Sequence, residues 1–316
     1  ALPSLAALSA SLDQLDSATG RRVVNARDRL VRDEDPQALA DAGTNPGVSE
    51  ILRREALALL AEWTQPRPME RITGRWDPLP ARSDTSAIAA TRRLLPALLA
   101  NSPDAVKATA IGLAGRYHIH EAVAPVLALA RDARQPLGSR VAAAQALVLF
   151  PSQETESLAT QLLTEDKPEL RAAARALLLA ATPEKGMTAM QQVFASGTLP
   201  EQHAALQTLG GVADPRVYTL LTTTYERMLT GEVDTALAVD LDDALKSAAT
   251  LNGLSVPDRN RRGRQHDALQ EKWLAQFPQE DSLRLYRTSL RGGDAQKGRE
   301  LFQQKVEFLC VRCHRI

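Results

Sequence analysis

Aromatic side chains are scarce in this 316-residue chain, at 4% of the residues, and only two cysteines are present. Neither sign of charge is in excess, because 38 Lys and Arg residues balance 38 Asp and Glu residues. That balance does not favour nucleic acid or anionic lipid as a partner. No stretch reaches the roughly 18 consecutive apolar residues of a transmembrane helix, so no membrane span is predicted. The first residues, "ALPSLAALSASL", lack a Met and a basic leader, so we expect a processed or cropped end instead of an intact signal peptide.

Valine, isoleucine and threonine do not alternate with polar residues, whereas alanine and leucine dominate the chain. This composition predicts an all-helical protein. Four prolines recur at a nearly fixed spacing, with 136 − 103 = 33, 168 − 136 = 32 and 200 − 168 = 32 residues between them, namely Pro103, Pro136, Pro168 and Pro200. A proline fits the first turn of a helix, where its missing N–H costs no hydrogen bond, and Ser102 is a plausible cap for the first of these helices.

A basic residue follows each of these prolines, and an alanine-rich segment comes next, closing with leucines in most copies; the basic residues are Lys107, Arg140, Arg171 and His203. A second amphipathic segment follows every time, which gives two helices in about 32 residues, the layout of a helical solenoid. The pattern resembles HEAT-type repeats. "ILRREALALLAEW" is similar to an earlier copy, with Arg54 in the basic position, and an irregular insert over residues 64–84 separates it from the regular repeats of about 102–231. We therefore expect a HEAT-like α-α superhelical solenoid over residues 1–290.

The segment "SVPDRNRRGRQHD" is expected to be a loop between two further helices, and it is rich in arginine at positions 259, 261, 262 and 264. A solvated basic loop is the simpler interpretation; an acidic partner or an anionic group is the alternative.

The two cysteines stand three residues apart, and a histidine follows at once in "CVRCHRI". This spacing is typical of c-type haem attachment, because Cys310 and Cys313 can add to the two vinyl groups of one porphyrin while His314 reaches the iron as an axial ligand. A thioredoxin-type redox pair would need a βαβ frame, and a zinc site would need more thiolates or imidazoles. A pair of inert thiols is the remaining alternative.

The preceding segment, "GGDAQKGRELFQQK", predicts a helix capped by Asp294. It resembles the N-terminal helix of class I cytochromes c. That resemblance implies that Gly298 lies where the family packs its first helix against its last, and that Phe302 lies near the haem edge. Residues 291–316 are then the first helix of a truncated cytochrome c domain. The family's second axial ligand, usually Met, would follow the motif, whereas all four methionines of this chain precede it.

Repeats that run into a cytochrome module resemble the large secreted, planctomycete-type haem-binding dehydrogenase-like proteins. The resemblance implies electron transfer: haem c would accept electrons from a dehydrogenase domain or protein similar to sugar or alcohol dehydrogenases, in the periplasm or outside the cell. The compartment would also tolerate a disulfide between Cys310 and Cys313 in the absence of haem. The alternative is a protein-protein interaction scaffold that binds its partner on the concave face of the solenoid.

Other candidate residues are interpreted as structural. His118 and His120 in "YHIH" fit a helix junction better than a metal pair, and Trp63 and Trp76 fit packing anchors at the edges of the insert. No zinc-protease helix, phosphate-binding loop or nucleophile elbow is present, so no catalytic site is predicted in this chain.

Overall fold

The structure is a computed structural model that describes residues 2–30, 32, 34–251, 254–290, 298–299 and 301–302. Those residues form fifteen α-helices and no strand, which confirms the all-α prediction. The chain divides at Leu158 into two compact units, and the boundary falls inside helix α9 (Gln153–Leu162). The predicted boundary between residues 290 and 291 lies at the edge of a stretch outside the described residues, so it stays a prediction.

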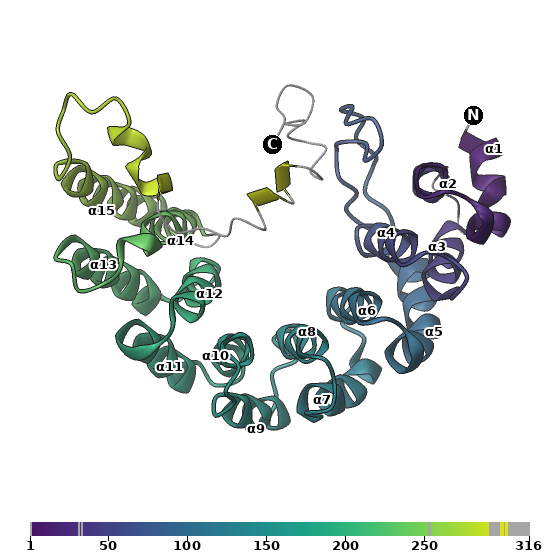
Figure 1. Ribbon diagram of the computed structural model, residues 1–316, viewed down its shortest axis with the longest axis horizontal. Coiled ribbons are helices and arrows are strands. Elements are labelled where there is room, and N and C mark those ends of the chain that lie inside the picture. Colours follow the sequence, from purple (N-terminus) through teal and green to yellow (C-terminus); the bar gives the residue numbers. More distant parts are fainter. Residues whose placement is uncertain are drawn as a thin grey trace. The chain divides into compact units, whose positions relative to one another are not determined.

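Unit 1, up to Leu158, is built of α-helices and two short 3-10 helices (Figure 1): α1 (Leu2–Ala7), η1 (Leu8–Gln14), α2 (Ser17–Leu30), α3 (Asp35–Thr44), α4 (Glu50–Ala61), α5 (Thr85–Asn101), α6 (Asp104–Arg116), η2 (His120–Ala122), α7 (Val123–Arg131) and α8 (Leu137–Leu147). Unit 2, from Ala159 to Arg299, contains α10 (Pro168–Ala181), α11 (Pro183–Ser196), α12 (Leu199–Gly210), α13 (Pro215–Leu229), η3 (Thr235–Leu237), α14 (Ala238–Thr250), α15 (Val256–Leu274) and η4 (Arg284–Leu290). None of the helices in the described ranges is long and apolar enough to cross a bilayer.

Helix pairs stack in two rows, as the repeat spacing predicts. In unit 1 the first helices form one row, with α4 packed between α2 and α6 and α6 packed against α8. The second helices α3, α5 and α7 form the other row, on the outside of the curve of this unit (Figure 1). In unit 2, α12 packs between α10 and α14 in the same manner. Many of the contact positions are buried alanines, which let the helix axes approach closely. The HEAT-like solenoid is thereby confirmed.

The basic position has a structural role in two of the repeats. Arg140 is only 5% exposed, and its Nε donates to the carbonyl of Ala130 at 3.0 Å, near the end of the preceding helix α7. Arg53 is equally buried and donates to the Gly43 carbonyl at 2.9 Å near the end of α3. A guanidinium here satisfies carbonyls that a helix end leaves without partners and complements the helix dipole. The prediction of Arg54 for this position is wrong by one residue, because the true repeat begins at the N-cap Ser49.

Two further repeat predictions are corrected. The N-cap of α6 is Pro103, so Ser102 does not cap this helix; its hydroxyl accepts a hydrogen bond from Arg53 Nη2 at 2.8 Å. In the repeat that begins with α12, Gln202 takes the place of this arginine and donates to the carbonyls of Val193 and Gly197. His203 instead pairs with Asp240, with 2.7 Å between Nδ1 and Oδ2.

The insert between α4 and α5 folds over α2 and α4. A single antiparallel bridge joins Met69 and Trp76, and Gly74 turns the chain with φ 66°, a conformation that favours glycine. Glu70 accepts hydrogen bonds from Asn25 of α2 and from the backbone of Ile72, so the turn is fixed to the solenoid. Trp63 is 3% exposed, as predicted, whereas Trp76 is 67% exposed, so its assignment as a packing anchor is wrong.

The predicted arginine-rich loop is the first half of α15. Ser255 caps the helix by accepting from the Asp258 backbone N–H, and arginine and glutamine are good helix formers. Arg262 is 8% exposed, donates to the Ala248 carbonyl at 2.9 Å and stacks on Tyr218. The Arg262 guanidinium thus binds groups within unit 2. The loop prediction is wrong because tertiary contacts bury one face of this polar segment.

Candidate functional site

The predicted haem residues fall almost entirely outside the described residues. Cys310, Cys313 and His314 are not among them. Phe302 is described, with helical backbone and a half-buried side chain. A Cβ added to Gly298 would meet no described atom within 4 Å. The part of the chain that the structure describes contains no group of three or more His, Cys, Asp or Glu side chains that could hold a metal ion, and the haem site stays a prediction.

His118 and His120 lie at the junction between α6 and α7. Their rings pack edge-on against Phe150, with centroid separations of 6.1 Å and 5.2 Å. His118 has a positive φ of 50°, which lets the chain reverse after α6. These contacts agree with the structural interpretation of the two histidines.

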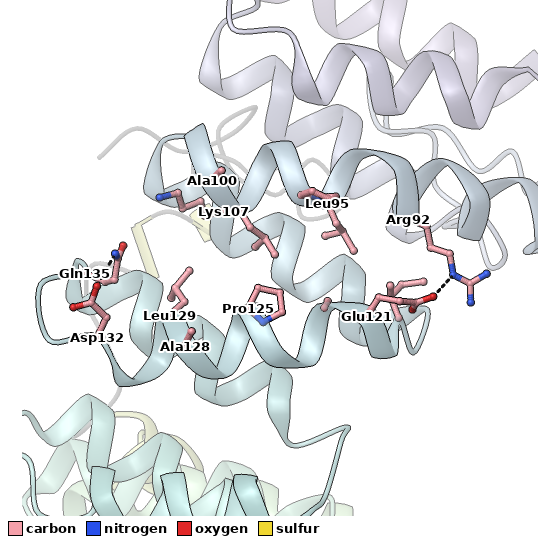
Figure 2. Close-up of a pocket in the computed structure, with 14 residues that line it drawn as sticks. Arg92, Leu95, Ala100, Lys107, Glu121, Pro125, Ala128, Leu129, Asp132 and Gln135 are labelled. Atoms are coloured by element: carbon pink, nitrogen blue, oxygen red, sulfur yellow. Dashed lines mark hydrogen bonds and ion pairs between the residues drawn. The ribbon is translucent and has the colours of Figure 1, made fainter.

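A groove lined mostly by apolar residues lies in unit 1 between α5 and α7, two helices of the outer row (Figure 2). Its volume is about 630 Å³, within the range of ligand pockets. One helical face of α5 and one of α7 form its walls, and residues from α6 and from the two adjoining junctions complete it. The lining residues are Arg92, Leu95, Pro96, Leu99, Ala100, Lys107, Ile119, Glu121, Ala122, Pro125, Ala128, Leu129, Asp132 and Gln135.

The groove, which we call the α5–α7 groove, exists because its walls pack in different directions. Helix α5 packs on α3 and α6, whereas α7 packs on α8. Leu95 and Ile119 at the base of the groove are buried. Of the other apolar lining residues, Leu99 and Leu129 are half-buried, and Pro125 and Ala128 are exposed. Pro96 lies inside α5 and has no N–H to donate to the Arg92 carbonyl, so this wall carries one acceptor without its usual helical partner.

Charged residues close the two ends of the groove. At one end Arg92 and Glu121 form an ion pair with 3.3 Å between Nε and Oε1. At the other end Asp132 accepts from Arg134 Nε at 2.9 Å and from Gln135 Nε2 at 3.2 Å. The hydrogen bond from the Arg134 side chain is the main cause that holds the pKa of Asp132 well below its usual range. Lys107, at this same end, has no hydrogen-bond or ion-pair partner among the described residues.

The first-helix row, where we expected a partner surface, carries paired charges of both signs. Arg71 of the insert pairs with Glu62 at 2.8 Å, and in unit 2 Glu201 accepts from Arg171 and Arg175. The α5–α7 groove lies in the other row, and sequence analysis missed it because Leu95, Leu99 and Leu129 have the spacing of ordinary core positions. Prolines on the same helical faces, Pro96 and Pro125, were the available signal.

Comparison with known proteins supports the fold alone. No model of a protein family matches the sequence, and no curated protein matches it significantly. Among solved structures the chain is similar to one from the complex of CpcE and CpcF of phycocyanin lyase from Nostoc sp. PCC7120. The TM-score is 0.54 at 14% sequence identity, and the match covers 84% of this chain and 94% of that chain. The chain is thus a helical-repeat solenoid similar in fold to that lyase chain.

Proposed function

We propose that this chain is an interaction scaffold of the HEAT type whose docking site is the α5–α7 groove. The observation that carries the proposal is the row of exposed and half-buried apolar residues on two neighbouring helices, which includes Leu99 of α5 and Pro125, Ala128 and Leu129 of α7. Contiguous exposed apolar surface on a folded protein is typical of interaction sites. The structurally similar lyase chain comes from a two-chain complex, which supports a scaffold that works with a protein partner.

A photo-cross-linking experiment tests this function. We expect benzoylphenylalanine at position 128, an exposed position of α7 that lines the groove, to form a cross-link with one protein partner in extracts of the source cells. Leu99→Lys places a charge in the apolar wall and is expected to reduce that cross-link at least tenfold, by analogy with the loss of an interface anchor.

The matched control places benzoylphenylalanine at position 191, an exposed residue of α11 in unit 2. No product of the same mass should form there. Equal cross-linking at positions 128 and 191, or a product that Leu99→Lys leaves unchanged, would contradict the proposal. Circular dichroism of each variant verifies that the helices remain folded.

We also propose electron transfer as a second function, because the Cys-x-x-Cys-His motif has a specific chemical meaning. In this proposal Cys310 and Cys313 hold haem c covalently, His314 is an axial ligand, and Phe302 lies near the haem edge. A bound haem would supply one-electron chemistry, and the electron donor would be a dehydrogenase domain or protein in the periplasm or outside the cell. The motif and the preceding "GGDAQKGRELF" segment support this proposal, and no described contact bears on it.

Expression of the protein in a host that attaches c-type haem tests the second function. We expect a covalent mass increase of one haem and a c-type absorption band, because both thiols of the motif are available for attachment. The double variant Cys310→Ala, Cys313→Ala should lose both signals. An unmodified mass for the wild-type chain would refute the haem assignment.

A further inference from the structure

The α5–α7 groove has the length of two helical turns. Its α5 wall runs from Arg92 to Ala100, and the eight steps between these residues span about 12 Å at 1.5 Å per residue. On α7 the lining residues Pro125, Ala128 and Leu129 lie at helical spacing over about 6 Å, and Ala122 and Asp132 extend this wall beyond the two ends of the helix. A third helix laid between these walls would place three side chains, at positions i, i+4 and i+7, along the groove.

The backbone of the walls also favours a helical occupant. Both walls are α-helices, whose N–H and C=O groups are already paired within each helix. The groove therefore offers no ladder of donors and acceptors to an extended peptide; the one carbonyl freed by Pro96 is not enough. A segment that binds here must satisfy its own backbone, as an α-helix does.

Charge distinguishes the two ends of the groove. Arg92 is paired with Glu121, and Asp132 is paired with Arg134. Lys107 is the groove cation that has no partner among the described residues, and its residue is half-buried. A carboxylate from an occupant would form an ion pair with Lys107 without displacing an existing pair. A cation at the same place would be repelled by the Lys107 ammonium.

We infer that the groove takes a short amphipathic α-helix of a partner protein, with three apolar side chains on one face and an acidic side chain at the end that meets Lys107. This inference rests on the proposed scaffold function and adds the chemistry of the partner. Lys107 sets the charge preference, and the apolar wall around Leu99 supplies the main contact.

Selection from a displayed peptide library tests the inference. The library consists of 16-residue alanine-based helices randomised on one face, and the wild-type chain is the bait. We expect enrichment of large apolar residues at i, i+4 and i+7 and of Asp or Glu at one flanking position. With Lys107→Glu as the bait, Lys or Arg should replace the acid at that position.

An enriched peptide then gives the quantitative result by fluorescence anisotropy. Changing its acidic residue to the neutral amide should weaken binding to the wild type about fivefold, the upper range for a partly exposed ion pair. The same change should have no effect on binding to Lys107→Met, which keeps a chain of similar length without the charge. Leu99→Lys should abolish binding of both peptides.

Two outcomes would overturn the inference, and they are distinguishable from failure of the scaffold function. The charged-helix inference is wrong if the acidic and amide peptides bind equally, or if enrichment shows no helical spacing. In that case the cross-link at position 128 still supports docking in the groove. Peptides that bind Leu99→Lys as well as the wild type, together with loss of the specific cross-link, remove both.

Discussion

Asp28→Ala is expected to lower the free energy of unfolding of unit 1 by about 3–5 kcal/mol, the usual effect of removing one partner from a buried ion pair. Asp28 of α2 accepts a hydrogen bond from Arg82 of the insert at 2.8 Å. Their side chains are only 9% and 4% exposed. The variant would leave the Arg82 guanidinium buried without its carboxylate.

The surroundings of Arg82 explain why this effect should be large. Its Nε and Nη2 atoms are buried and have no hydrogen-bond partner among the described residues, and its guanidinium lies 4.1 Å from the centroid of the Trp63 ring. Asp28 thus provides the ion-pair contact of this group. Burial raises the pKa of Asp28 above its usual value, although the charge of Arg82 acts in the opposite direction. Both groups are strongly desolvated.

Urea unfolding followed by circular dichroism, with separate transitions for the two units, measures the change. The double variant Asp28→Leu, Arg82→Met is the matched control, because it removes both charges and keeps similar volumes. We expect it to differ from the wild type by no more than about 1 kcal/mol, since replacing a whole buried pair by apolar residues is often neutral or stabilising. Equal destabilisation by the single and double variants would show that packing, not the unpaired charge, dominates.

Gly186→Ala is expected to destabilise unit 2 by about 2–3 kcal/mol, in the range for overpacking a tight helix contact. A Cβ at this position would lie 2.5 Å from the backbone nitrogen of Leu179 and would overlap its Cα. The obstacle is backbone, so it cannot move by a rotamer change. Helices α10 and α11 would have to separate, and Met187 and Met190 of the α11 core face would be displaced with them.

Gly112→Ala is the control for this prediction. Gly112 lies inside α6, and a Cβ there would meet no described atom within 4 Å. Because alanine is a better helix former than glycine, the free energy of unfolding of unit 1 should rise by about 0.5–1 kcal/mol. The unfolding experiment described above reports both variants, and a destabilising Gly112→Ala or a neutral Gly186→Ala would show that the helices are spaced differently.

Local features of the sequence predicted the repeat architecture well. Pro103 and Pro136 occupy N-caps, and Pro168 begins α10, so the regular proline spacing marks where the first helix of each pair begins. Alanine-rich segments became the buried first helices, as the all-helical prediction required. These features succeeded because helix starts, helix propensity and amphipathic spacing depend on residues close in sequence.

Predictions that depended on burial were less accurate. Trp76 is exposed although Trp63 is buried, and Arg262 is buried inside what seemed a charged loop. Both outcomes depend on remote contacts: the insert folds back on α2, and Arg262 reaches the Ala248 carbonyl. The sequence around either residue carries no sign of these contacts.

The sequence by itself determined the all-α class, the helix pairs and the Cys310–Cys313–His314 motif, which remains a haem prediction. Tertiary structure alone decided that Arg53, not Arg54, caps a neighbouring helix, and that an apolar groove lies between α5 and α7. The physical reason is that a helical stripe of leucines predicts which face is apolar but not whether another helix covers it. Leu99 and Leu129 are half-buried because α5 packs against α3 and α6, whereas α7 packs against α8.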